Sequence, residues 1–190
     1  MGAFKELYQH CQSLKIPVSR KDIQPKVLEL TNTSRVSAVK STLDTEVVRG
    51  YFLSINNKEA RLVQQFGCDV IVMARTLNYC WERFVFTKEL MHLFDSAEEK
   101  TSGSSELEAL LANFELPDTN GCKQFKSDVR GLWMALSCLC PEHERIAFKD
   151  NIDKGHIDHY GIALQLKIPE KYVKHYFSAA YEKIIPLLIE

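Results

Sequence analysis

Residues 82–94 read Glu-Arg-Phe-Val-Phe-Thr-Lys-Glu-Leu-Met-His-Leu-Phe, and the predicted fold is built around them. The apolar residues of this stretch recur at helical spacing, so the range 80–94 is predicted to be a well-buried helix. Towards its end, the run Lys88-Glu89-Leu90-Met91-His92 places a lysine and a histidine four positions apart. Side chains at positions i and i+4 lie on one face of a helix, so Lys88 and His92 are expected to project to the same side.

This run matches the helical zinc-protease signature H-E-x-x-H except at its first position, where Lys88 replaces a histidine. In the intact signature two imidazoles hold one Zn²⁺ and the glutamate polarises the bound water. Glu89 and His92 keep two of these groups. The Lys88 ammonium, however, is cationic at neutral pH and has no lone pair for a metal. A zinc site would need Lys88 deprotonated, or ligands from elsewhere in the chain.

Composition predicts an ordinary soluble globular protein with one core. The chain has 190 residues, of which 45% are hydrophobic and 26% charged, and a formal net charge of −1. These values indicate neither a nucleic-acid-binding nor a membrane protein. No apolar run approaches the roughly 20 residues that span a bilayer, and the N-terminus lacks a signal peptide, so a cytoplasmic location is expected.

The six cysteines form no C-x-x-C pair, which excludes a zinc ribbon and a thioredoxin motif. Free thiols are expected in the cytosol. Cys138 and Cys140 lie in an apolar run and are expected to be buried in the core rather than bound to metal.

The pattern along the chain predicts an α+β fold in a single domain, with an N-terminal segment over about 1–48, a core with the motif helix over 49–141 and a helical part over 142–190. Strands are expected at 49–55 and 69–73, while 32–41 fits a loop or an edge strand and 58–66 fits a short helix or a strand. Before the first strand, a helix is expected over 4–14 and a short helix or turn from Ser19. After the motif helix, the pattern predicts a mobile loop over 95–105, a short helix over 106–114 and a long buried helix over 125–140 that is ended by Pro141. A surface segment over 142–150 and two C-terminal helical patterns, broken at Ile168-Pro169, complete the chain.

Several of these motifs occur in an order that resembles the ImmA/IrrE family of zincin-like metallopeptidases. An edge strand and a short turn, within 71–78, precede the Arg-Phe pair and the H-E-x-x-H-like helix. A later helix ends in Ala-Leu-Ser-Cys-Leu-Cys-Pro over 135–141, and the segment 162–169 with Val173 is similar to the tail of the family. The resemblance covers about residues 50–190. It implies a zincin-like fold, in which a small twisted sheet over 50–74 packs on the motif helix and on the 125–140 helix.

The resemblance also assigns residues. It places the general-base glutamate at Glu89, the second zinc-binding histidine at His92, the first zinc-binding histidine at Lys88 and the third-ligand carboxylate at Asp128. Family members often cleave or control a repressor partner under stress or in mobile elements. The implied protein is therefore bacterial or phage-encoded, with a regulatory role and a protein partner such as a helix-turn-helix repressor.

Three readings of these four side chains stay open. The ammonium, the two carboxylates and the imidazole could satisfy one another without metal, with Lys88 paired to Glu89 or Asp128 in part of the volume of the lost cation. His92, Asp128 and another histidine could form an altered zinc site. Lys88, Glu89 and His92 could also carry out acid–base chemistry without metal.

Three functions follow, and whether the chain is an enzyme is left open. The preferred one is a regulatory or protein-interaction module that has lost standard zinc hydrolysis and has no cofactor. The first alternative is a divergent zinc peptidase that cleaves a repressor-like partner with Glu89 as the general base. The second alternative is a DNA-binding regulator that uses the C-terminal helix pair, with Lys171, Lys174 and His175 facing a groove, although the net charge disfavours nucleic acid.

Other candidates have simpler explanations. His156 and His159 are spaced as a metal pair but stand among solvated charges, so a surface loop is expected. His10, His143 and His175 are isolated and are expected to be structural or exposed. The aromatic residues over 172–181 recur at helical spacing, which favours core packing over a base-stacking platform.

Overall fold

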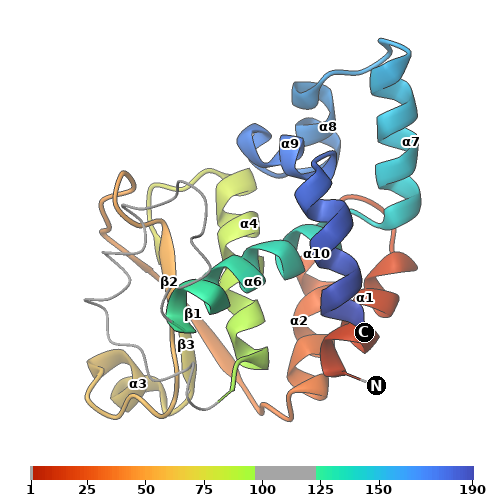
Figure 1. Cartoon of the computed structure of the whole chain (residues 1–190). Helices are drawn as coiled ribbons and strands as arrows, with labels where there is room; N and C mark the ends of the chain where they lie inside the picture. The colour runs from red at the N-terminus through yellow and green to blue at the C-terminus, as the bar shows by residue number, and fades with distance from the viewer. Residues whose placement is uncertain (1, 97–122) are drawn as a thin grey trace.

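The computed structural model describes residues 2–96 and 123–190 and has an α+β architecture, as predicted (Figure 1). The expected loop at 95–105 is described only at Asp95 and Ser96, and the expected helix at 106–114 lies outside the described residues. The described elements are, in chain order, α1 (Ala3–Gln12), α2 (Arg20–Leu30), β1 (Val36–Ser41), β2 (Gly50–Leu53), α3 (Arg61–Phe66), β3 (Asp69–Ala74), α4 (Tyr79–Leu90), the 3₁₀ turn η1 (Met91–Phe94), α6 (Lys123–Leu139), α7 (Glu142–Asp153), α8 (His159–Leu166), the 3₁₀ turn η2 (Glu170–Tyr172), α9 (Val173–Tyr176) and α10 (Ala179–Ile189).

The sheet has three strands in the order β1-β3-β2, with β3 in the centre. β1 runs parallel to β3 from the pair Val36–Asp69, and β2 runs antiparallel to it from the pair Gly50–Met73. The two strands expected from the sequence are therefore confirmed. The segment 32–41, which fitted either a loop or an edge strand, supplies β1, so the sheet begins earlier in the chain than the predicted range 50–74. The other undecided segment, 58–66, forms the short helix α3.

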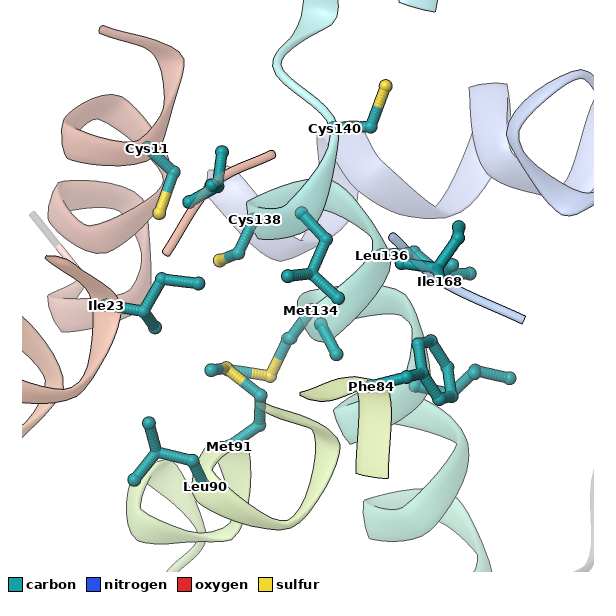
Figure 2. Packing of buried hydrophobic residues seen from close by; sticks show 14 of the residues in the cluster. Cys11, Ile23, Phe84, Leu90, Met91, Met134, Leu136, Cys138, Cys140 and Ile168 are labelled. Atoms are coloured by element: carbon teal, nitrogen blue, oxygen red, sulfur yellow. The ribbon is translucent and has the colours of Figure 1, made fainter. Parts of the chain in front are cut away.

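The central strand separates two apolar layers. All six residues of β3 are buried, and successive side chains of a strand point to opposite faces. Val70 and Val72 belong to a small cluster with Val63 of α3, whereas Ile71 and Met73 belong to the main core. The main core contains residues from the N-terminal, central and C-terminal parts of the chain, and in Figure 2 the side chains of Cys11 and Cys138 lie close together between α1 and α6. Cys138 and Cys140 are 0% and 1% exposed, which confirms the predicted core location.

Helix α4 carries the motif and lies between the sheet and α6 (Figure 1). Asn78 caps its N-terminus, because the Asn78 side chain accepts a hydrogen bond from the Trp81 N–H. The predicted helix over 80–94 ends as an α-helix at Leu90, and the next four residues form the 3₁₀ turn η1. Lys88 and Glu89 consequently belong to the last turn of α4, while His92 belongs to η1.

Buried Arg83 ties this helix to two distant segments. Its guanidinium donates to the carbonyl oxygens of Leu166 at 2.5 Å and Lys167 at 3.2 Å, and also to that of Val18. Backbone carbonyls thus satisfy a charge whose pKa is lowered by burial. A buried donor group of this kind fixes the segments whose acceptors it uses, because leaving those acceptors unpaired costs free energy. Arg83 therefore holds α8 and the loop before α2 against α4.

The C-terminal part differs from the predicted helix pair. The second apolar pattern, over 172–184, was expected to form one helix. It is divided into η2, α9 and α10 instead, because the Ser178 side chain accepts from the Tyr181 N–H and starts a new helix there. Lys167 ends α8 in the left-handed conformation at φ 54°. The segment 142–150, expected at the surface, forms α7, which buries Arg145 and Phe148. No described helix is both long enough and apolar enough to cross a bilayer.

Candidate functional site

The four residues assigned from the sequence meet where α4 and η1 pack against α6. Lys88 and Glu89 come from α4, His92 from η1 and Asp128 from α6. The two helices approach closely at Gly131, where a Cβ would lie 3.5 Å from the Lys88 carbonyl oxygen. The small residue permits this approach, and Asp128, one helical turn before it, lies against the end of α4.

The Lys88 ammonium lies between two carboxylates. Its Nζ is 3.0 Å from Glu89 Oε1 and also forms an ion pair with Asp128 Oδ1. The side chains are largely buried, with 15% of Lys88, 3% of Glu89 and 8% of Asp128 exposed. The predicted pairing of Lys88 with a carboxylate is therefore present, and it involves both Glu89 and Asp128. Burial alone lowers the pKa of Lys88, but the charges of Asp128 and Glu89 outweigh it and raise that pKa.

The pKa values of the two carboxyl groups are shifted in opposite directions. Burial raises the pKa of Asp128, yet the charges of Lys88 and His92 and their hydrogen bonds reverse the effect, so the pKa of Asp128 is lowered. For Glu89 burial is the larger influence, and its pKa is raised in spite of Lys88 and His92. Asp128 is thus the firmly ionised partner of the lysine, and Glu89 is the more easily protonated one.

His92 is enclosed by acidic and hydroxyl groups. Its Nδ1 lies 2.7 Å from Asp95 Oδ2 and 3.1 Å from Ser127 Oγ, and its Nε2 lies 3.5 Å from Glu89 Oε2. Burial lowers the pKa of His92, but the hydrogen bonds to Asp128 and Asp95 and the charge of Glu89 raise it to about 9. The ring is consequently an imidazolium at neutral pH.

Asp95 extends the charge network and corrects the expectation that the loop 95–105 begins here as a mobile segment. Its side chain is buried because it accepts from Ser127 Oγ at 2.5 Å and from Arg130 at 2.6 Å, in addition to its contact with His92. These bonds lower the pKa of Asp95 against the opposing effect of burial. An acidic residue three positions after His92 was the signal in the sequence that could have assigned Asp95 to the site.

The residues present do not fit a zinc ion of the kind that the H-E-x-x-H signature holds. Zinc needs deprotonated ligands with free lone pairs, but His92 is protonated and the Lys88 ammonium occupies the space between Glu89 and Asp128. Within residues 2–96 and 123–190, no three His, Cys, Asp or Glu side chains are arranged to hold a metal.

Proton transfer without metal is also poorly supported by this geometry. An acid or base works best when its pKa lies near the working pH. The pKa values of Lys88 and Asp128 are both displaced in the direction that strengthens their ion pair. The arrangement therefore stabilises charge more than it transfers protons, and only the raised pKa of Glu89 moves towards neutrality.

A cavity of about 420 Å³ opens over this cluster. Lys88, Glu89 and Asp128 line it together with residues of three other regions: the end of the β1–β2 connection, the first turn of α4 and the C-terminal turns. Sequence reasoning did not connect these regions, since nothing in the residue pattern brings Arg49, Trp81 and Lys171 to one cavity. The lining residues outside the cluster include Val48, Arg49, Gly50, Trp81, Phe84, Leu132, Lys171, Tyr172, Lys174 and His175.

Of the remaining histidine candidates, His156 and His159 do not line this cavity, whereas His175 does. His156 and His159 are exposed, and His159 stacks on Phe177 with the ring centroids 6.1 Å apart. His175, half-buried beside Trp133, lines the cavity. The cavity therefore gathers Lys171, Lys174 and His175, the residues proposed to face a DNA groove, around Lys88.

Comparison of the chain with protein-family models, with curated proteins and with solved structures found no match.

The first prediction concerns the buried ion pair. Asp128→Asn should lower the free energy of unfolding by about 3 kcal/mol, because it leaves the Lys88 charge buried with one partner fewer. The double variant Lys88→Met, Asp128→Leu should lose clearly less than the sum of its single variants, since both charges are removed. Urea unfolding of the five proteins, namely the wild type, Asp128→Asn, Lys88→Met, Asp128→Leu and the double variant, measures both effects.

Lys40 and Glu82 form the matched control. They are paired at 2.6 Å, but their side chains are 49% and 31% exposed. Glu82→Gln is therefore expected to cost less than about 1 kcal/mol. If Asp128→Asn costs no more than this control, the buried pair does not stabilise the fold.

The second prediction concerns pH. The pKa of His92 is about 9 in the folded chain, above its ordinary value of 6.5. Its contribution to stability is complete below about pH 6.5 and is lost as the pH rises through about 9. Between about pH 6 and pH 10 the wild type should therefore lose up to about 3 kcal/mol relative to His92→Asn. Parallel curves of unfolding free energy against pH for the two proteins would show that His92 is not charged in the fold.

Proposed function

We propose that this protein is a regulatory, peptide-binding module built on an ImmA/IrrE-like peptidase scaffold, in which a buried ion pair takes the place of zinc. The observation that carries the proposal is the position of the Lys88 ammonium between Glu89 and Asp128. The resemblance assigns metal ligands and the general base to this cluster. A lysine that pairs with both carboxylates supplies the positive charge without the Lewis acid, so the scaffold is kept and standard hydrolysis is lost.

The arrangement of the elements supports the scaffold. The resemblance implies that a small sheet packs on the motif helix and that a second helix brings a carboxylate to the motif. The described chain has β3 and β2 against α4, and Asp128 of α6 contacts Lys88. The N-terminal helices and β1 fall outside the part of the chain that the resemblance covers.

The edge of β2 supports peptide binding. β2 pairs with β3 on one side, and the described residues place no strand on its other side. The Ala74 N–H donates to the Arg49 carbonyl, and bonded pairs alternate along antiparallel strands. The backbone N–H and C=O groups of Tyr51 and Leu53 therefore point towards β3, while those of Gly50 and Phe52 point away from it. Such an edge can accept an extended peptide as an additional strand.

The edge and the charge cluster are joined through two residues. Phe52 stacks on His92, with ring centroids 5.8 Å apart, and Gly50 lines the cavity above Lys88. A Cβ at Gly50 would lie 2.4 Å from Val85 Cγ1, so glycine allows β2 to lie this close to α4. A peptide bound along β2 would pass the cavity, which is where a peptidase scaffold needs its substrate.

The third prediction concerns metal content. Purified protein should contain well below one equivalent of zinc by elemental analysis. The variant Lys88→His, Asp128→Glu restores the residue types that the resemblance assigns to the ligands, and it should gain close to one equivalent. The matched control is His143→Lys, which alters an exposed histidine and should leave zinc content unchanged.

Two results would count against the proposal. One equivalent of tightly bound zinc in the wild type would favour the divergent peptidase, and cleavage of a protein partner that chelators and Glu89→Gln both abolish would establish it. A restored variant that folds but gains no zinc would contradict the peptidase scaffold.

The fourth prediction concerns peptide binding. Selection from a phage-displayed library of random peptides of about twelve residues should yield binders, and synthetic copies should lose affinity when N-methylated at alternate residues but not at the residues between them. This alternation follows from strand addition, because every second backbone N–H of the peptide bonds to the edge. Equal losses from both N-methyl patterns would exclude pairing with β2, and a selection without binders would remove the proposed function.

A further inference from the structure

The mouth of the cavity over Lys88 carries three cations from separate elements. Arg49 directly precedes β2, Lys171 belongs to η2 and Lys174 belongs to α9, and all three line the cavity. Within residues 2–96 and 123–190, no carboxylate lies within ion-pair distance of any of them. Glu46, the exposed acid that also lines the cavity, forms no ion pair with them. The mouth therefore concentrates positive charge that the described fold does not neutralise.

The aromatic wall of the cavity holds two of these cations in place. The Arg49 guanidinium lies 4.4 Å and the Lys171 ammonium 4.7 Å from the centroid of the Trp81 ring. Lys171 is also 4.9 Å from the Tyr172 ring, which itself stacks on Phe84 at 4.0 Å. Cations held over aromatic rings are attracted without being neutralised, so their charge remains available to a ligand.

The cations also repel one another. Burial lowers the pKa of Lys171, and the charges of Arg49 and Lys174 lower it further. His175 behaves in the same way, because burial, Lys174 and Lys171 all lower its pKa, so it adds no charge at neutral pH. An anion placed among these groups would relieve the repulsion as well as pair with them.

The floor of the cavity is electrically balanced. Lys88 is paired with both Glu89 and Asp128, and His92 lies 3.5 Å and 3.7 Å from the same two carboxylates, so the formal charges of the four groups cancel. A negatively charged group that entered the cavity would be attracted by the mouth, while the floor would offer it no unpaired cation. It would therefore stop at the level of Arg49 and Lys171 and not displace the ion pair below.

From this separation of charge, resting on the proposed peptide-binding function, we infer that the protein selects extended peptide segments that carry an Asp or Glu side chain, which enters the cavity mouth between Arg49, Lys171 and Lys174. Gly50 lines the cavity and begins β2, so a strand added to β2 passes the mouth. Every second side chain of such a strand points to the same face. A cavity of about 420 Å³ admits a side chain but not a nucleic-acid duplex, which favours a peptide carboxylate.

The fifth prediction tests this selection on the full chain. Binders from the random library should share Asp or Glu at one position. Replacing that residue with Asn or Gln should weaken binding about tenfold in fluorescence anisotropy, and Arg49→Gln, Lys171→Gln and Lys174→Gln should each weaken binding of the acidic peptide about fivefold. None of the three changes should affect the matched amide peptide. Lys183→Gln, at an exposed site on α10 away from the cavity, is the control and should alter neither affinity.

The possible outcomes separate the two proposals. Binders without an acidic preference, or equal losses for the acidic and amide peptides, would overturn the inference and leave the peptide-binding function standing. No binders at all would remove both. Binding of a labelled DNA duplex of about 20 base pairs is measured as well. Salt-sensitive duplex binding that Lys171→Gln and Lys174→Gln abolish, together with no binding of peptides, would assign the cations to DNA instead.

Discussion

A buried ammonium must be paired, and the interaction of Lys88 with Glu89 and Asp128 meets this requirement at the point where the motif helix, its 3₁₀ extension and α6 come together. Removing one partner would leave an uncompensated charge in a low-dielectric site, which is much more costly than losing an exposed pair. The packing of α6 on α4 therefore depends on charge as well as on apolar area. Gly131 allows the approach, Asp128 provides the carboxylate, and the main core surrounds the contact. A divalent cation in the same place would impose a similar constraint on the two helices.

Beyond the Lys88 ion pair, the buried side chains continue with charges of alternating sign. His92, raised to a pKa of about 9, lies between the pair and Asp95, and Asp95 in turn accepts from Arg130. Each charge is thus stabilised by the next, which explains why the pKa values of Lys88 and His92 move up while those of Asp95 and Asp128 move down. A network of this kind is suited to holding a shape. It is less suited to proton transfer, which requires a group whose pKa lies near the working pH.

In contrast to this interior, where the charges are paired, the cavity mouth carries cations without carboxylate partners among the described residues. Arg49 precedes Lys171 and Lys174 by more than a hundred residues. Trp81 lies against both Arg49 and Lys171, and Arg83 fixes the end of α8 to α4. The proposed function places peptide recognition at this mouth and at the β2 edge, and it leaves the cluster below as structure. In that proposal the cavity serves binding, and Lys88 takes the position that the resemblance gives to a zinc ligand.

The sequence alone determined the α+β class, the two strands over 49–55 and 69–73, the buried motif helix and the long helix ending before Pro141, because periodicity and proline are local properties. It offered the pairing of Lys88 with Glu89 or Asp128 as one of three alternatives, and the resemblance placed Asp128 by counting back from Pro141. The structure brings these side chains together. Only the tertiary structure decided the rest. The parallel strand β1 depends on a partner distant in sequence, and the burial of Asp95 depends on Ser127 and Arg130 of another helix. The cation cluster depends on three separate elements that meet at one mouth, so no window of sequence contains it.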